Sequence, residues 1–226
     1  MDPLAHLAIA TMTFLITHAV PSTPLRGALV RSLGERQYLG AFSLVSFLTL
    51  GWTIYAYGHA PLKPLWQVTG LKLLPLFVMP FAFILLTCGV MGRNPTAVRQ
   101  ESALESEHRG ILRVTRHPMM WGFALWAAAH LLARGDAASL IFFGGFLVLA
   151  LSGTVLIDMR KSRAPGLGEA WKRFAGVTSN LPFQAILEGR NRFRPGEIGW
   201  IKILSGIALY AVFFVLHPQL FRVSPY

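Results

Sequence analysis

The chain has 226 residues, of which 54% are apolar and only 14% are charged. Ordinary soluble domains carry roughly 25% charged residues, so a soluble protein of this composition would lack the polar side chains needed to cover its surface. The formal net charge of +11 could suit nucleic acid, but the basic residues lie between apolar segments, so no nucleic acid is expected as a partner. The single cysteine, Cys88, excludes a disulfide framework within one chain and a cysteine metal cluster.

Six apolar stretches follow one another, and each approaches the roughly 20 residues that a transmembrane helix needs. They cover residues 4–20, 38–57, 71–91, 119–133, 138–157 and 199–217. The fourth stretch is short, and Pro75 and Pro80 in the third predict a kink or a late helix start. The sequence therefore predicts an all-α fold, a single domain over residues 1–226, built as a polytopic membrane helical bundle of about six transmembrane helices.

The loops predict the orientation of this bundle. The loops after the first, third and fifth stretches hold 16 of the 21 lysines and arginines, and the positive-inside rule assigns them to the cytoplasm. Both termini then face outward. The one long loop, residues 158–198, places aromatic and aliphatic side chains among basic ones, which predicts a segment lying in the cytoplasmic interface. Those side chains are Trp171, Phe174, Leu181 and Phe183.

Histidines are the main polar groups at the ends of the predicted helices. Four of them are His18, His59, His117 and His130. Imidazole can ligate haem iron or exchange protons, and it can also lie at the membrane interface with no chemical role. Gly122, Trp126 and His130 share one stripe of the fourth helix. Such a stripe suits a flat macrocycle, and it equally suits ordinary helix packing.

A series of short motifs opens and follows the fourth stretch: Arg116-His117-Pro118, Trp121-Gly122, Leu125-Trp126 and Ala129-His130. Further motifs are His18 with Pro21, Leu25-Arg26, Asn94-Pro95 and the segment Thr-Ser-Asn-Leu-Pro-Phe at residues 178–183. In this order and spacing the motifs resemble the NnrU family, which is bacterial and associated with denitrification. The resemblance implies a multi-pass protein of the bacterial inner membrane, in which the outward-facing termini predicted from the loops are periplasmic. It also implies denitrification reductases as partners, beside membrane lipid.

The NnrU resemblance extends to the plant and cyanobacterial 15-cis-ζ-carotene isomerase, which carries haem b. The histidines regarded as important there correspond to His18, His59 and His130, and the resemblance implies that His18 and His130 are the axial ligands. This chain departs from that enzyme at Ala127, where the enzyme has a cysteine. A switch to a thiolate ligand is therefore not expected.

A second resemblance is to membrane methyltransferases of the isoprenylcysteine and phospholipid type, which open a helix with Arg-His-Pro and bind S-adenosylmethionine. An acidic pair follows much later in those enzymes. Here that pair is reduced to Asp158, followed by Met159-Arg160, while Glu169 and Trp171 keep part of the aromatic tail. The resemblance makes S-adenosylmethionine the alternative cofactor.

The predicted topology conflicts with the axial pair that the resemblance implies. His18 lies near the cytoplasmic face, whereas His130 lies near the outer face, twelve helical residues or roughly 18 Å into the fourth span. Bis-imidazole ligation needs both nitrogens within a few Å of one iron. Depth in the membrane pairs His18 with His117, and His59 with His130.

We therefore expect an NnrU-like inner-membrane protein that binds haem b and supports nitrite or nitric oxide reduction, or a haem-dependent isomerisation in the bilayer. The expected cofactor site comprises His18, His130, His59, His117, Arg116 and Trp126, with iron held by His18 and His130. Arg113 and Arg116 would pair with haem propionates or serve only as positive anchors. The alternatives are a non-catalytic assembly factor for denitrification reductases and an S-adenosylmethionine-dependent methyltransferase. The sequence assigns no catalytic residue.

Overall fold

The computed structural model describes residues 1–97, 100–105 and 109–225. Within these ranges the chain is helical, and its one β contact is an isolated bridge between Pro64 and Asp136. The long helices are α1 (Pro3–Ala19), α3 (Glu35–Gly58), α4 (Leu74–Met91), α6 (Pro118–Arg134), α7 (Ala137–Ser162) and α10 (Trp200–Phe221). The short ones are α2 (Pro24–Leu33), α5 (Ile111–Val114), α8 (Gly168–Val177) and α9 (Gln184–Leu187). The predicted all-α class is confirmed.

Five helical segments are long and apolar enough to cross a membrane: Pro3–Ser22, Glu35–Gly58, Thr69–Met91, Ala137–Ser162 and Trp200–Phe221. The predicted fourth span forms α6, which is shorter, with 17 residues. A helix of that length measures roughly 26 Å, slightly less than the hydrocarbon thickness of about 30 Å. Because α6 packs between α4 and α7, its neighbours cover much of its surface.

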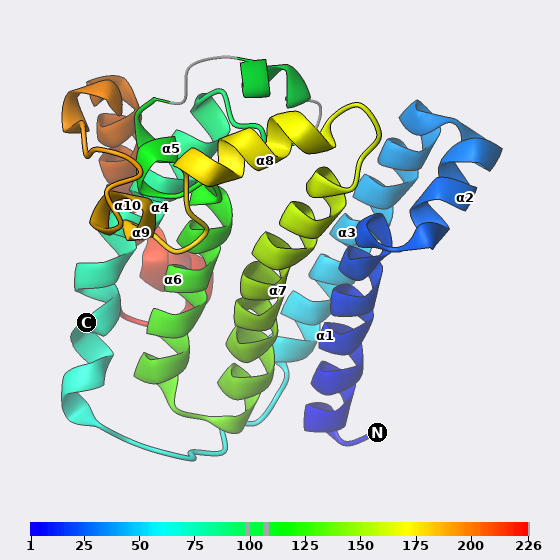
Figure 1. The fold of residues 1–226 in the computed structure, drawn as a ribbon. Coiled ribbons are helices and arrows are strands. Elements are labelled where there is room, and N and C mark those ends of the chain that lie inside the picture. Colours follow the sequence, from blue (N-terminus) through cyan, green and yellow to red (C-terminus); the bar gives the residue numbers. More distant parts are fainter. Residues whose placement is uncertain (98–99, 106–108, 226) are drawn as a thin grey trace.

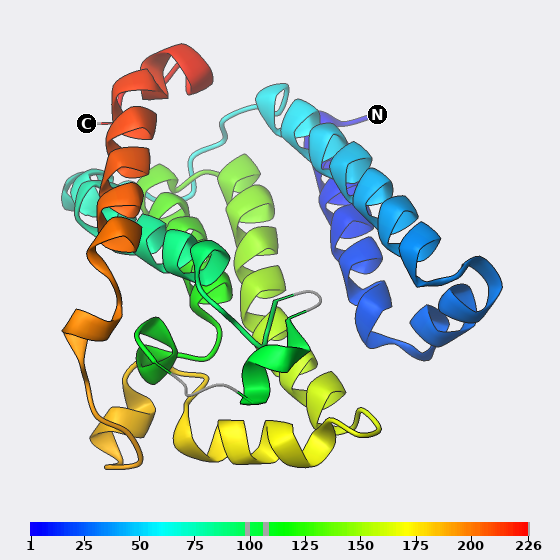
Figure 2. The ribbon, with the colours of Figure 1, turned by 90° about the horizontal axis from the view of Figure 1, so that it is seen from above.

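The long helices form a bundle in which α7 joins two groups (Figures 1 and 2). On one side lie α1 and α3, an antiparallel pair carrying α2 at its turn. On the other side α6 packs on α4, which in turn packs on α10. α7 contacts α1 and α6 directly. The outer faces of α3 and α10 are rich in exposed apolar side chains, as expected for surfaces in contact with lipid.

Helix boundaries follow from local chemistry. Gly135 adopts the left-handed conformation (φ 60°) that ends α6, and Asp136 caps α7 by accepting a hydrogen bond of 2.9 Å from Ser139 N–H. Pro75 occupies the first turn of α4, where its missing N–H costs nothing. The predicted late start of this helix is confirmed, because a 3₁₀ turn over Thr69–Leu73 precedes it.

Glycines permit close approach of the membrane helices. A Cβ added to Gly122 of α6 would stand 2.8 Å from Leu86 Cγ and 2.9 Å from the Ala82 carbonyl oxygen of α4. Gly145 of α7 is similarly close to Thr11 of α1. Small residues at such crossings bring the backbones into van der Waals contact, which drives helix association in lipid.

The long loop is more ordered and more buried than the sequence suggested. α7 continues to Ser162, and α8 lies across the end of the bundle (Figure 1). Trp171 and Phe174 of α8 are each 1% exposed and pack against Leu104 and Leu112. These two rings therefore form a small core that fastens α8 to the bundle, and the expected position of the 158–198 loop in the membrane interface stays a prediction.

Replacing Gly122 with Ala should lower the stability of the bundle by about 1–3 kcal/mol, because the added methyl group forces α6 away from α4. Thermal unfolding in detergent measures the effect. Gly144→Ala is the matched control, since a Cβ there meets only Leu140 Cδ1, at 3.8 Å. Equal midpoints for the two variants would contradict this view of the α4–α6 contact.

Candidate functional site

A buried charge cluster joins the start of α6 to α7. The Arg116 Nε–H group donates to both Asp158 oxygens at 3.0 Å, and Arg116 Nη2 donates to Oδ2 as well. His117 Nε2 lies 2.8 Å from Asp158 Oδ1. The His117 side chain is completely buried, and that of Asp158 is 20% exposed. One carboxylate therefore binds two consecutive side chains.

The protonation of His117 follows from this geometry. Burial lowers the pKa of His117, although the hydrogen bond and charge of Asp158 oppose the shift. The neutral ring donates its Nε2–H to the carboxylate, so Nδ1 is unprotonated and carries a lone pair. Nδ1 is buried and has no hydrogen-bond partner among the residues that the structure describes. A buried acceptor without a partner indicates that His117 has a role beyond packing.

The segment at residues 178–183 is clamped against the same helix start. Arg116 N–H donates to the Ser179 carbonyl at 2.9 Å, and the Thr115 hydroxyl donates to the Asn180 carbonyl at 2.6 Å. Trp121 Nε1–H donates to that same carbonyl of Asn180, at 2.8 Å. The Arg116-His117-Pro118 motif and the 178–183 segment, which lie far apart in the sequence, are thus in direct contact.

Arg113 and Arg116 both have carboxylate partners within the chain. Arg113 Nε binds Glu197 Oε2 at 2.7 Å, and its Nη1 binds Asn191 Oδ1 at 2.8 Å. The expectation that Arg113 and Arg116 pair with haem propionates is therefore not supported: each guanidinium already neutralises a carboxylate of the protein.

A second candidate site, the aromatic cluster, surrounds His130. The His130 ring stacks on Phe143, with centroids 5.2 Å apart, and also contacts Trp126 of its own helix at 5.8 Å. Trp126 in turn contacts Phe143 and Phe146, each at 5.3 Å. Phe142 and Tyr57 extend the cluster toward α3. Of the predicted macrocycle stripe, Trp126 and His130 face this cluster, while Gly122 packs on α4.

The tautomers of the helix histidines suit metal ligation. His130 Nδ1 lies 2.9 Å from the Trp126 carbonyl, and His18 Nδ1 lies 2.9 Å from the Phe14 carbonyl. A carbonyl only accepts, so each Nδ1 carries the proton and each Nε2 presents a lone pair. Metal-binding histidines are commonly fixed in this way by a hydrogen bond to the other nitrogen. His59 makes the same contact with Tyr55.

The structure does not bring His18 and His130 into contact. The rings that connect them are Phe14, Phe146 and Trp126, in steps of 4.1, 5.2, 5.3 and 5.8 Å between neighbouring centroids. The Phe14, Phe146 and Trp126 rings therefore occupy the space between the two imidazoles.

No hydrogen bond or ring contact within the described residues joins the two pairs that membrane depth predicts, His18 with His117 and His59 with His130. His117 binds Asp158 rather than His18, and His59 contacts Tyr55 of its own helix rather than His130. The histidine close enough to influence His130 electrostatically is His217 of α10, a pairing that sequence spacing did not indicate. Within the described ranges, no three or more His, Cys, Asp or Glu side chains gather as a metal site.

The fold and the two sites define a polytopic α-helical membrane protein with an imidazole in an apolar, aromatic interior. The NnrU protein family matches residues 6–225; the chain belongs to the NnrU family.

Two curated relatives are both named 15-cis-zeta-carotene isomerase, chloroplastic. The one from Zea mays is 29% identical over 191 residues, which cover 82% of this chain and 51% of the relative. The one from Arabidopsis thaliana is 28% identical over 194 residues, covering 84% and 52%. The chain thus spans about half the length of these relatives. No solved structure matches the chain.

Asp158→Asn should destabilise the protein by about 3 kcal/mol, because the change leaves the part-buried Arg116 guanidinium without its counter-charge. The loss is measured by thermal or denaturant unfolding in detergent. Glu169→Gln, which removes an exposed pair with Lys172, should change little. If both variants unfold alike, the cluster does not hold α6 to α7.

Glu197 should make stability depend on pH in the acid range. Hydrogen bonds from Arg113, opposed by partial burial and helped by the Gly110 N–H, lower the pKa of Glu197 from 4.5 to about 2. The folded pKa is depressed, so the stabilisation is present above 4.5 and is lost as pH falls toward 2. The difference in unfolding midpoint between wild type and Glu197→Gln should shrink over that interval. A difference that stays constant there would exclude this ion pair as its source.

Proposed function

We propose that this NnrU-family protein binds haem b in the aromatic cluster around His130, within the bacterial inner membrane and with both termini periplasmic. The observation that carries the proposal is the state of His130. Its Nδ1–H is held by the Trp126 carbonyl at 2.9 Å, which leaves a lone pair on Nε2, and the ring lies against Phe143 and Trp126. An imidazole fixed in this tautomer in an apolar pocket is the usual protein contribution to a haem site.

The chain's own residues would each have a defined task. His130 supplies the lone pair, and Trp126, Phe143 and Phe146 provide flat apolar surfaces that exclude water. These rings fill the space between α1, α6 and α7, so a macrocycle enters only if Phe146 and Trp126 turn aside. The second ligand implied by resemblance, His18, needs the same movement, because Phe14 and Phe146 stand between it and His130.

The reaction that we propose is redox-gated and takes place in the bilayer. Bound haem would supply an iron that changes oxidation state and takes a small ligand such as nitric oxide, or that assists the isomerisation of a conjugated apolar chain. The name of the curated relatives supports the isomerase-like alternative. The denitrification role rests on the resemblance of the motifs to bacterial NnrU proteins, with nitrite and nitric oxide reductases as the partners. Ala127, which is completely buried, offers no thiolate beside His130.

The methyltransferase alternative is less well supported by the geometry. Both oxygens of Asp158 are engaged by Arg116 and His117, so this carboxylate is not available to the ammonium or ribose of S-adenosylmethionine. The other alternative, a non-catalytic assembly factor, predicts that the protein binds no haem.

Purified full-length protein should show a Soret band at near-stoichiometric haem, with oxidised and reduced spectra typical of nitrogen ligation. His130→Ala should lose most of this haem, because the Nε2 lone pair that would bind iron disappears. His59→Ala is the matched control: its ring also ends a membrane helix, but the interactions that it makes in the described part of the chain are with Tyr55 of its own helix. His18→Ala and His217→Ala identify the second ligand, which is the residue whose loss changes the spectrum without abolishing the Soret band.

Two outcomes would count against the proposal. A protein that stays colourless after haem supplementation would end it and favour the assembly factor. A coloured protein with equal haem in the His130 and His59 variants would move the site away from the aromatic cluster.

A further inference from the structure

Arg160, near the end of α7, is a partly buried guanidinium whose charge is not balanced. Its Nη1 donates to the Pro21 carbonyl at 3.5 Å, and no carboxylate in the described part of the chain lies within ion-pair distance of it. The two carboxylates that act on it electrostatically, Glu35 and Glu101, are bound by other basic side chains. A cation that is partly removed from water and lacks a counter-charge is costly. An anion from outside the chain would therefore stabilise it.

The hydroxyl of Tyr38, in the first turn of α3, is a donor without an acceptor. Tyr38 is 4% exposed, and its hydroxyl oxygen is buried with no hydrogen-bond partner among the described residues. The charged groups that act on this hydroxyl are Arg26, Arg160 and Glu35. Because a buried donor left unpaired is costly, an acceptor that binds between the two arginines and reaches the hydroxyl would remove that cost.

The Leu25-Arg26 motif of the sequence completes this arrangement. The Arg26 guanidinium lies over the Tyr38 ring, 5.6 Å from its centroid, and its Nη2 donates to Glu35 at 2.8 Å. The Arg26 side chain is 34% exposed, so it can move. α7 contacts the 3₁₀ turn that leads into α2 (Figure 2), so the arginines of α2 and α7 lie at the same end of the bundle.

An apolar stripe leads away from these donors along α3. Tyr38, Phe42 and Val45 are four and three residues apart and so share one face of the helix. The Tyr38 and Phe42 rings stack, with centroids 6.3 Å apart, and Val45 is 42% exposed. Leu25, beside Arg26, is 52% exposed. The charged groups thus stand where the apolar surface of a membrane helix begins.

From these contacts we propose that Arg26, Arg160 and the Tyr38 hydroxyl bind the phosphate group of an anionic lipid. Guanidinium groups hold phosphate through charge-assisted hydrogen bonds, and basic sites between membrane helices bind lipid head groups. The phosphate draws the Arg26 side chain off the ring and reaches the hydroxyl, while an acyl chain lies along the α3 stripe. Free phosphate would use the same donors but leave the stripe unused. The proposal is independent of haem.

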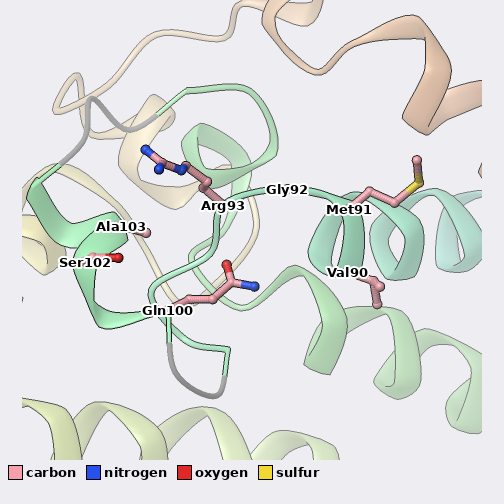
Figure 3. Close-up of a pocket in the computed structure, with 7 residues that line it drawn as sticks. All are labelled: Val90, Met91, Gly92, Arg93, Gln100, Ser102 and Ala103. Carbon is pink, nitrogen blue, oxygen red and sulfur yellow. The ribbon is translucent and has the colours of Figure 1, made fainter.

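A cavity elsewhere offers a second place for a lipid head group. It has a volume of about 300 Å³ and opens at the end of α4, where it is lined by residues 90–93 and by Gln100, Ser102 and Ala103 (Figure 3). The Gln100 side-chain oxygen accepts the Asn94 N–H at 2.9 Å. Gln100→Glu keeps that oxygen and adds a negative charge to the wall, so it would repel a head group from this cavity.

Native mass spectrometry of the full-length protein in detergent tests the proposal, with phosphatidylglycerol, phosphatidylcholine and inorganic phosphate as separate probes. Wild type should bind one phosphatidylglycerol about tenfold more tightly than phosphatidylcholine, because the choline cation is repelled by the two arginines. Arg160→Gln and Tyr38→Phe should each weaken phosphatidylglycerol binding about tenfold, since each removes a hydrogen bond to a charged acceptor.

Tyr38→Phe also separates binding from packing. It keeps the ring, and with it the Arg26 and Phe42 contacts, and removes a hydroxyl that has no partner in the described part of the chain. In lipid-free detergent the variant should therefore unfold no earlier than wild type, whereas phosphatidylglycerol should raise the unfolding midpoint of wild type more. If Tyr38→Phe binds phosphatidylglycerol like wild type, the proposal is overturned.

Two exposed positions on α3 supply matched controls. Arg36→Gln removes the same charge two residues before Tyr38, and Tyr55→Phe removes the hydroxyl of a tyrosine that is 59% exposed. Both should bind phosphatidylglycerol like wild type. Equal loss in Arg36→Gln and Arg160→Gln would show diffuse attraction to charge and overturn the proposal. Loss in Gln100→Glu with binding kept in Arg160→Gln would move the lipid to the cavity, and inorganic phosphate that binds as tightly as the lipid would overturn the lipid source.

Discussion

The carboxylate of Asp158 is the constraint on which the rest of the structure depends. It binds Arg116 and His117 together and so sets where α6 begins relative to α7. The residues just before α6 then receive the 178–183 segment through backbone hydrogen bonds, which positions the chain that returns to α10. In a low-dielectric environment such a pair is stable only when its hydrogen bonds are satisfied, and here the Arg116 and His117 donors both are.

α7 connects the two candidate sites. Its Phe143 contacts His130 in the aromatic cluster, and its Asp158 binds His117 at the other end, roughly 22 Å farther along the same helix. A displacement of α7 along its axis would therefore alter both environments at once.

The sequence predicts the long helices well, because the bilayer sets both their length and their composition. The expected span 119–133 became α6, Pro118–Arg134, with Pro118 in its first turn. The partner of His117 could not be predicted, since Asp158 lies 41 residues away and no periodic pattern joins them. The burial of Trp171 and Phe174 against the bundle could not be predicted, because periodicity identifies an apolar face but not the side chains that cover it. The haem ligands, inferred by resemblance, remain a prediction.

The turn between α6 and α7 has a consequence for how the protein enters the membrane. Only Gly135 and Asp136 separate the two helices, and the Gly135 carbonyl accepts hydrogen bonds from Leu65 and Trp66. We expect two helices joined so tightly to enter the membrane together as one hairpin. The 17-residue α6, which carries His130, would then be inserted with the 26-residue α7. Formation of the His130 site thus depends on a neighbouring helix as well as on α6 itself.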